Sequence, residues 1–122
     1  MSAIDDLAGV SFCYLTTTGR RTGDLHEIEI WFGLAGSTAY VMSGGGERSD
    51  WVKNLRVNPA VSVRIDGRPF SGSARIVQDP EEEAMVRHLL AAKYQGWEEG
   101  GELSAWARTA LPVALDLRDR SE

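Results

Sequence analysis

Hydrophobic and polar residues alternate with a period of two over most of the chain, which is the pattern of half-buried β-strands. In residues 27–32, Ile28, Ile30 and Phe32 fall on one face of such a strand, with polar residues between them. Five further stretches repeat this pattern or are rich in strand-forming residues: 12–17, 39–43, 61–66, 70–76 and 113–117. Asp66-Gly67, between two of them, is typical of a tight hairpin turn. The pattern therefore predicts six strands.

Two stretches change to the helical period. From Asp79, an N-cap acid is followed by Pro80 at the first helical position and by a carboxylate three residues after the cap. Apolar residues then recur at helical spacing, and Gly96 is a typical helix end. A shorter helix is predicted to start at Ser49 and to end before Asn58-Pro59, and residues 103–108 could form one or two more turns.

The predicted order is β-β-β-α-β-β-α-β with short connections. Six mostly antiparallel strands in 122 residues would leave two bare edges if they lay flat, and closing them into a small barrel removes those edges. We therefore expect one mainly β (α+β) domain over residues 1–122, with a six-stranded antiparallel barrel and two to three helices. An open α+β sheet with one helix on its face is the alternative.

Composition narrows the class of protein. With 43% hydrophobic and 25% charged residues, the chain is typical of a soluble globular domain. The single cysteine, Cys13, excludes a disulfide framework, and His26 and His88 lie too far apart in sequence to suggest a metal site. No apolar run approaches the ~20 residues of a membrane helix. The N-terminus is acidic, unlike a secretion signal, so we expect a cytoplasmic protein without an integral membrane segment.

The charge is unevenly distributed. A net charge of −5 argues against a nucleic-acid partner. Residues 1–78 contain eight basic and eight acidic side chains, whereas residues 79–122 contain five and ten, so the excess negative charge lies in the last third. Basic residues gather near glycines in the neutral part, which is how a protein can hold a small anion. An ordinary solvated surface is the alternative.

Two glycine-containing loops are candidates for such an anion site. Residues 16–23 (TTTGRRTG) join two strands and combine backbone N–H groups, hydroxyls and two guanidiniums that could bind phosphate. Residues 43–54 begin with Ser43 and three glycines, and they place Trp51 in the first turn of a helix with Asn54 one turn later. A plain hairpin loop and a flexible linker are the structural alternatives. If the two loops converge, they form a site for a flat cofactor that carries a phosphate.

These loops carry a family resemblance. The segments Leu15–Gly23, Ser43–Gly46, Ser49–Leu55, Asn58-Pro59 and Leu111–Leu115 resemble the deazaflavin-dependent nitroreductase family, over roughly residues 11–118. The resemblance implies the split β-barrel of the flavin-binding pyridoxamine-phosphate oxidases and the cofactor F420. It also implies a small electron-poor acceptor: a nitroaromatic, a quinone or an enone.

The resemblance also implies roles for individual residues. The cofactor-binding set is Thr16, Arg20, Arg21, Thr22, Gly23, His26, Ser43, Gly44, Asp50, Trp51, Lys53 and Asn54. His26 could instead simply end a strand. Tyr94 would border the acceptor and help to protonate it, and Ser43 would lie beside the deazaflavin ring. No metal ligands are expected.

We therefore expect an oxidoreductase that transfers hydride from reduced F420 to a small acceptor. Two alternatives remain open: the same barrel with FMN as its cofactor, and a carrier that binds a cofactor or lipid-like ligand without turnover. Many family members carry basic residues soon after the first loop, where this chain has Leu25, His26 and Glu27, and this loss of positive charge weakens the expected binding of the cofactor's acidic tail. Glu27 and Glu29 also bring two carboxylates toward this region. The apolar outer faces would allow a homodimer.

Overall fold

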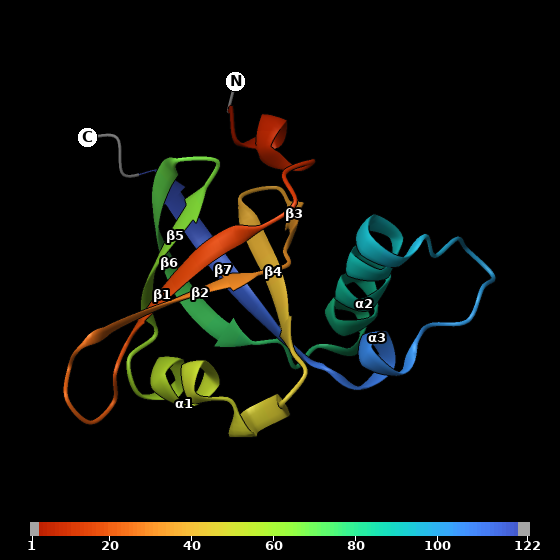
Figure 1. Ribbon diagram of the computed structural model, residues 1–122. Coiled ribbons are helices and arrows are strands. Elements are labelled where there is room, and N and C mark those ends of the chain that lie inside the picture. The colour runs from red at the N-terminus through yellow and green to blue at the C-terminus, as the bar shows by residue number, and fades with distance from the viewer. Residues whose placement is uncertain (1–2, 120–122) are drawn as a thin grey trace.

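The computed structural model describes residues 3–119 (Figure 1). Seven strands form one sheet: β1 Cys13–Thr18, β2 Leu25–Ile30, β3 Gly33–Ala35, β4 Thr38–Ser43, β5 Ala60–Ile65, β6 Arg68–Ile76 and β7 Leu111–Asp119. The α-helices are α1 Asp50–Val57, α2 Pro80–Gln95 and α3 Ala105–Thr109, and two short 3-10 helices are η1 Ala3–Leu7 and η2 Gly46–Arg48.

The sheet curls around its interior as a half-barrel (Figure 1). Its strand order is β2-β1-β5-β6-β7-β4-β3, and every neighbouring pair is antiparallel. This confirms the expected antiparallel α+β architecture. The expected number of strands is wrong by one, because the sheet has seven, and β2 and β3 remain as edges.

The missed strand is β3, which begins at Gly33, directly after the end of the predicted strand 27–32. β2 ends at Ile30. The backbone N–H of Phe32 donates to the Tyr94 hydroxyl at 3.0 Å, and its carbonyl accepts from Lys93 Nζ at 2.8 Å. Side chains of α2 therefore form hydrogen bonds with both backbone groups of Phe32. The chain leaves its pairing with β1 at this point and pairs again from Gly33 with β4.

Apolar residues pack in two layers, one on each side of β4 and β7. The barrel interior holds the larger cluster, including Leu15, Phe32 and Leu115. The smaller cluster lies under α2, whose Val86 and Leu90 are fully buried. Strand β4 is therefore buried on both faces, and five of its six residues are buried.

The long helix α2 follows the sequence signals closely. The Asp79 carboxylate accepts a hydrogen bond from the Glu82 N–H at 2.9 Å, and the helix stops at Gly96 in a left-handed conformation with φ of 69°. Figure 1 places α2 and α3 beside the barrel, while α1 lies at the end of the barrel that carries the β1–β2 loop. Within residues 3–119, no helix is both long and apolar enough to cross a membrane.

Candidate functional site

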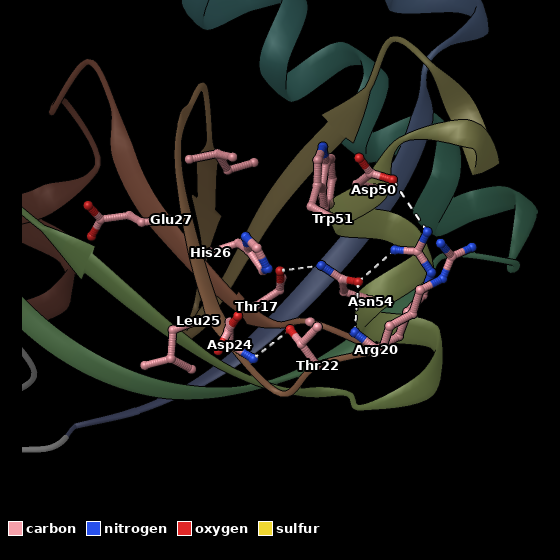
Figure 2. A pocket seen from close by; sticks show the side chains of 13 residues that line it. Thr17, Arg20, Thr22, Asp24, Leu25, His26, Glu27, Asp50, Trp51 and Asn54 are labelled. Atoms are coloured by element: carbon pink, nitrogen blue, oxygen red, sulfur yellow. Dashed lines mark hydrogen bonds and ion pairs between the residues drawn. The ribbon is translucent and has the colours of Figure 1, made fainter.

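A cleft of about 780 Å³ opens between the β1–β2 loop, strand β2 and helix α1 (Figure 2). Both loops singled out in the sequence contribute to it. Its lining residues are Thr17, Gly19, Arg20, Arg21, Thr22, Asp24, Leu25, His26, Glu27, Ile28, Asp50, Trp51 and Asn54.

The β1–β2 loop holds its own shape through backbone hydrogen bonds. The Gly19 N–H donates to the Asp24 carbonyl at 2.6 Å, and the Gly23 N–H donates to the Gly19 carbonyl at 3.0 Å. Gly23 has a φ of +81°, a conformation that an L side chain rarely adopts. The Thr22 hydroxyl accepts from the Asp24 N–H at 3.2 Å. Of the two arginines in this closed loop, Arg21 is exposed and Arg20 is half-buried.

Asn54 joins this loop to β1 and α1. Its side chain is buried, with a relative exposure of 4%. Its Oδ1 accepts from the Arg20 backbone N–H at 3.1 Å and from Arg20 Nη1 at 2.8 Å. Its Nδ2 donates to Thr17 Oγ1 at 3.2 Å. The three bonds fix one arginine of the loop against the helix, so the two sequence segments do converge.

Charged side chains lie at both ends of the cleft. Arg20 Nη2 lies 3.4 Å from Asp50 Oδ1, and Figure 2 shows this pair at one end with Glu27 at the other. Glu27 is itself paired with Arg64 at 3.0 Å. Within residues 3–119, the Arg21 guanidinium has no ion-pair partner. This guanidinium could therefore pair with a bound anion, beside the Asp24 carboxylate that also lines the cleft.

Trp51 supplies the flat apolar surface of the cleft. Its ring is half-buried, and it packs against the barrel core while lining the cleft. Opposite it, His26 lies so close to the loop that a Cβ added at Gly19 would be 2.9 Å from the imidazole Nε2. The same added Cβ would lie 3.1 Å from the Asp24 carbonyl, so Gly19 leaves room for both groups.

Seven predicted cofactor-binding residues line this cleft: Arg20, Arg21, Thr22, His26, Asp50, Trp51 and Asn54. Thr16, Gly23 and Lys53 do not line it. Strand β1 buries alternate residues, so Thr17 faces Asn54 while Thr16 lies on the opposite face. The alternation of Cys13 and Leu15 could have identified Thr17 instead of Thr16.

Ser43 and Gly44 lie outside the lining of this cleft. Ser43 is buried, and its hydroxyl donates to the Gly46 carbonyl at 3.0 Å and shares a hydrogen bond with Ser49 Oγ at 2.7 Å. Gly46 has a φ of +63°. The glycine loop is therefore a turn that links β4 to α1 through these bonds, and a Cβ on Gly44 would meet the Trp106 ring at 3.6 Å.

A second, aromatic groove of about 410 Å³ adjoins strand β2. It is lined by Glu29, Ile30, Trp31, Met42, Gln95 and Trp106. Trp31 stacks on Tyr94 with 4.3 Å between ring centroids, and the edge of Trp106 meets Trp31 at 5.4 Å. Trp106 therefore both packs and lines a groove, whereas Trp97 stacks on His88 at 4.3 Å.

Tyr94 lies behind this groove with its hydroxyl engaged. The oxygen accepts from the Phe32 N–H and lies 2.9 Å from the carbonyls of both Ser11 and Phe32. Burial raises the pKa of the Tyr94 hydroxyl. Cys13, in the barrel core, is fully buried, and burial raises the pKa of its thiol to about 12, so it is a core residue.

Comparison with known proteins gives one family and a shared fold. The family model described as F420H(2)-dependent quinone reductase matches residues 3–117. A solved protein of Mycobacterium tuberculosis is 23% identical with a TM-score of 0.78, over 98% of this chain and 81% of that one.

Two further solved structures share the fold. One, described as an F420 reductase, is 18% identical with a TM-score of 0.64, over 97% of this chain and 95% of that one. The other, a protein of Listeria innocua described as a pyridoxamine 5'-phosphate oxidase, is 18% identical with a TM-score of 0.68, over 98% and 95%. The chain therefore has the pyridoxamine-phosphate-oxidase-like fold.

Proposed function

The chain belongs to the F420H(2)-dependent quinone reductase family, and we propose that it transfers hydride from reduced F420 to a small electron-poor acceptor. The acceptor class is a nitroaromatic, a quinone or an enone. The observation that carries the proposal is the convergence of the Arg20–Arg21 loop and Trp51 on one cleft.

The residues of the cleft fit such a cofactor. A volume of about 780 Å³ is within the range of cofactor sites. The loop end offers two guanidiniums and the Thr22 hydroxyl, which are donors that suit a phosphate. The half-buried face of Trp51 suits a flat ring.

In this proposal the protein binds and orients, because the cofactor carries the chemistry. When bound, reduced F420 supplies the hydride. Arg20, Arg21 and Thr22 would hold the phosphate, and Asn54 would keep Arg20 in place. Trp51 would support the ring and keep water away from one of its faces.

The aromatic groove is the proposed acceptor site. Strand β2 lines the cleft with Leu25–Ile28 and the groove with Glu29 and Ile30, so the two hollows follow one another along this edge strand. Trp31, Met42 and Trp106 provide an apolar surface for a flat, electron-poor ring, and Gln95 offers an amide donor for its oxygen.

For Tyr94 and Ser43, to which the resemblance gives catalytic roles, we propose positioning roles instead. Both hydroxyls already make hydrogen bonds to backbone carbonyls. These bonds favour positioning over direct proton transfer: Tyr94 would support Trp31 from behind, and Ser43 would fix the turn before α1. Gly23, Lys53 and Thr16 are left without a direct role in the proposal.

Reduction of the acceptor is tested by mixing the purified protein with reduced F420 and a panel of quinones, nitroaromatics and enones while following cofactor absorbance. We expect oxidation with at least one class. Arg20→Ala/Arg21→Ala should raise the Kd for F420 more than a hundredfold, since each charge-assisted bond contributes ~1.5–3 kcal/mol. Arg118→Ala, on the exposed end of β7, is the matched control and should bind like the parent.

The alternatives are separated in the same assay. Titration with FMN in parallel tests the flavin alternative, because both cofactors carry a ring and a phosphate. Tight binding of F420 without reduction of any acceptor would favour the carrier. Unchanged affinity in the folded double variant would remove the phosphate assignment. Assembly as a homodimer stays a prediction, which sedimentation would test.

A further inference from the structure

The aromatic groove is lined by two indole rings that stand nearly perpendicular to each other. The planes of Trp31 and Trp106 meet at 89°, with 5.4 Å between the ring centroids. Tyr94 stacks on Trp31 with its plane parallel to within 3°, which holds the Trp31 ring in place. The face of an aromatic ring carries the negative part of its quadrupole, so several rings around one site attract positive charge. Quaternary ammonium groups are bound in this way.

Glu29 is the charged residue among those that line this groove. Its Oε1 accepts a hydrogen bond from the Tyr14 hydroxyl at 2.9 Å, which orients the carboxylate. Within residues 3–119, no ion pair joins Glu29 to a basic side chain, whereas Glu27, two positions earlier on β2, is paired with Arg64. The negative charge of Glu29 is therefore available to a ligand in the groove.

The elements around the groove add further negative charge. Helix α2 ends at Gln95, which lines the groove, and the C-terminal end of a helix carries a partial negative charge. Residues 97–104, which connect α2 to α3, carry three exposed glutamates and no basic residue: Glu98, Glu99 and Glu102. In the described part of the chain, none of these three forms an ion pair.

The basic side chains of α2 and α3 do not reverse this balance, and none of them lines the groove. Arg87 is paired with Glu83 at 2.7 Å. Lys93 donates to the Phe32 carbonyl at 2.8 Å, and Arg108 is exposed on α3. The positive charges of Lys93 and Arg108 stand against the four negative charges of Glu29 and the three loop glutamates, so negative charge predominates around the groove.

We propose that the groove is a site for flat rings that carry a positive charge, and that Glu29 makes it discriminate against negatively charged ones. The cationic group lies against the indole rings of Trp31 and Trp106 and pairs with the Glu29 carboxylate. The inference rests on the proposed function where it identifies this ligand as the acceptor: among quinones and nitroaromatics, those with a cationic group are favoured. The binding preference itself requires neither F420 nor reduction.

Three naphthoquinones test the inference, with a trimethylammoniomethyl, a methyl or a sulfonatomethyl group at the same ring position. Each is titrated into ¹⁵N-labelled protein without cofactor, and the Kd is taken from the indole N–H signals of the four tryptophans. We expect the cationic quinone to move the signals of Trp31 and Trp106 and to bind about tenfold more tightly than the anionic one, with the neutral one between them. A cation–π contact and an exposed ion pair each contribute a factor of a few.

Glu29→Gln separates the carboxylate from the rest of the groove, because glutamine keeps an acceptor for the Tyr14 hydroxyl. The ratio of the anionic to the cationic Kd should fall from about ten to about three. Glu81→Gln is the matched control: it removes one exposed carboxylate in the first turn of α2, about 21 Å along the helix from Gln95, and should keep the parental ratio. A general loss of structure would weaken binding of all three quinones together and leave their ratio unchanged.

The outcomes separate this inference from the proposed function. Absence of binding, equal binding of the three quinones by the parent, or a ratio that Glu29→Gln leaves unchanged would overturn the inference. Shifts of Trp51 or Trp97 in place of Trp31 and Trp106 would also overturn it. Binding of the cationic quinone in the groove without oxidation of reduced F420 by any acceptor removes the proposed function alone. Turnover of quinones with no charge preference in their binding removes the inference alone.

Discussion

Asn54→Ala is the perturbation that most directly probes how the cleft is held together. The substitution removes an acceptor for the Arg20 backbone N–H, an acceptor for the Arg20 guanidinium and a donor to Thr17. Neutral hydrogen bonds contribute about 1 kcal/mol each and a bond to a charged group about 1.5–3 kcal/mol. Because two of the bonds share one oxygen and water can replace part of the loss, we expect the free energy of unfolding to fall by about 3 kcal/mol.

Urea unfolding followed by tryptophan fluorescence measures this loss. For a chain of this length the melting temperature should fall by about 10 °C. The matched control is Asn58→Ala, whose side chain accepts a single hydrogen bond from the Ala60 N–H at 3.3 Å and should cost under about 1 kcal/mol. A loss in Asn54→Ala no greater than in Asn58→Ala would refute the role that we give to Asn54.

A double-mutant cycle separates the Arg20 contact from the rest. Arg20→Ala keeps the backbone N–H bond but removes the guanidinium bond to Asn54. We expect a coupling energy of about 1–2 kcal/mol between Arg20→Ala and Asn54→Ala. Additive effects of the two substitutions would mean that the guanidinium bond contributes nothing to stability.

Substitutions at Asp50, Tyr94 and Glu82 test three other contacts. Asp50→Asn should leave stability unchanged, because the Asp50 side chain is 85% exposed, and should tighten F420 binding several-fold by freeing Arg20; weaker binding in a fluorescence titration would contradict this. Tyr94→Phe should lower the free energy of unfolding by about 1–3 kcal/mol through the lost bonds to Phe32 and Ser11, with kcat within a few-fold of the parent; a hundredfold loss of kcat would instead indicate proton donation by Tyr94. Hydrogen bonds from Arg75 and Tyr40 lower the pKa of Glu82 from 4.5 to about 2. The stability that these bonds contribute is therefore fully present above pH 4.5 and is lost as the pH falls toward 2. Glu82→Gln should therefore cost about 1 kcal/mol in urea unfolding at pH 7 and less at pH 3, since Arg75 is half exposed; an equal cost at both pH values would contradict the assignment.

Local signals in the sequence were enough to predict most of the fold. Alternation located the other six strands, and Asp66-Gly67 forms the expected turn with φ of 50° and 82°. Asp79 and Gly96 end α2 as their types predict. Each of these features depends on a few neighbouring residues, which is why the sequence alone reveals them.

The features that were missed depend on contacts between distant residues. β3 arises because side chains from α2, some 60 positions away in sequence, form hydrogen bonds with the backbone N–H and carbonyl of Phe32. The 3-10 helix Ala3–Leu7 buries Ile4 and Leu7 against the barrel core, although its five residues are too few to show a periodic hydrophobic pattern. Such elements are determined by packing rather than by local propensity.

The candidate site also contains features that local sequence signals predict and features that they do not. The Arg20–Thr22 segment and Trp51 line the cleft as expected, because a hairpin loop and a first helical turn are local features. Ser43 closes the glycine loop as a turn through Gly46 and Ser49, and neither Ser43 nor Gly44 lines the cleft, so contact of this loop with a ligand stays a prediction. A run of glycines indicates freedom of the backbone without indicating what that freedom serves.

The central claim is that the β1–β2 loop and helix α1 together form the cofactor site. Titration of ¹⁵N-labelled protein with F420, followed residue by residue in amide spectra, tests it most directly. The account predicts that the chemical-shift changes saturate with added F420 and concentrate in residues 19–26 and 50–54 and in the Trp51 indole N–H. Saturating shifts confined to α2 and α3, with the amides of Arg20, Arg21 and Trp51 unmoved, would contradict it.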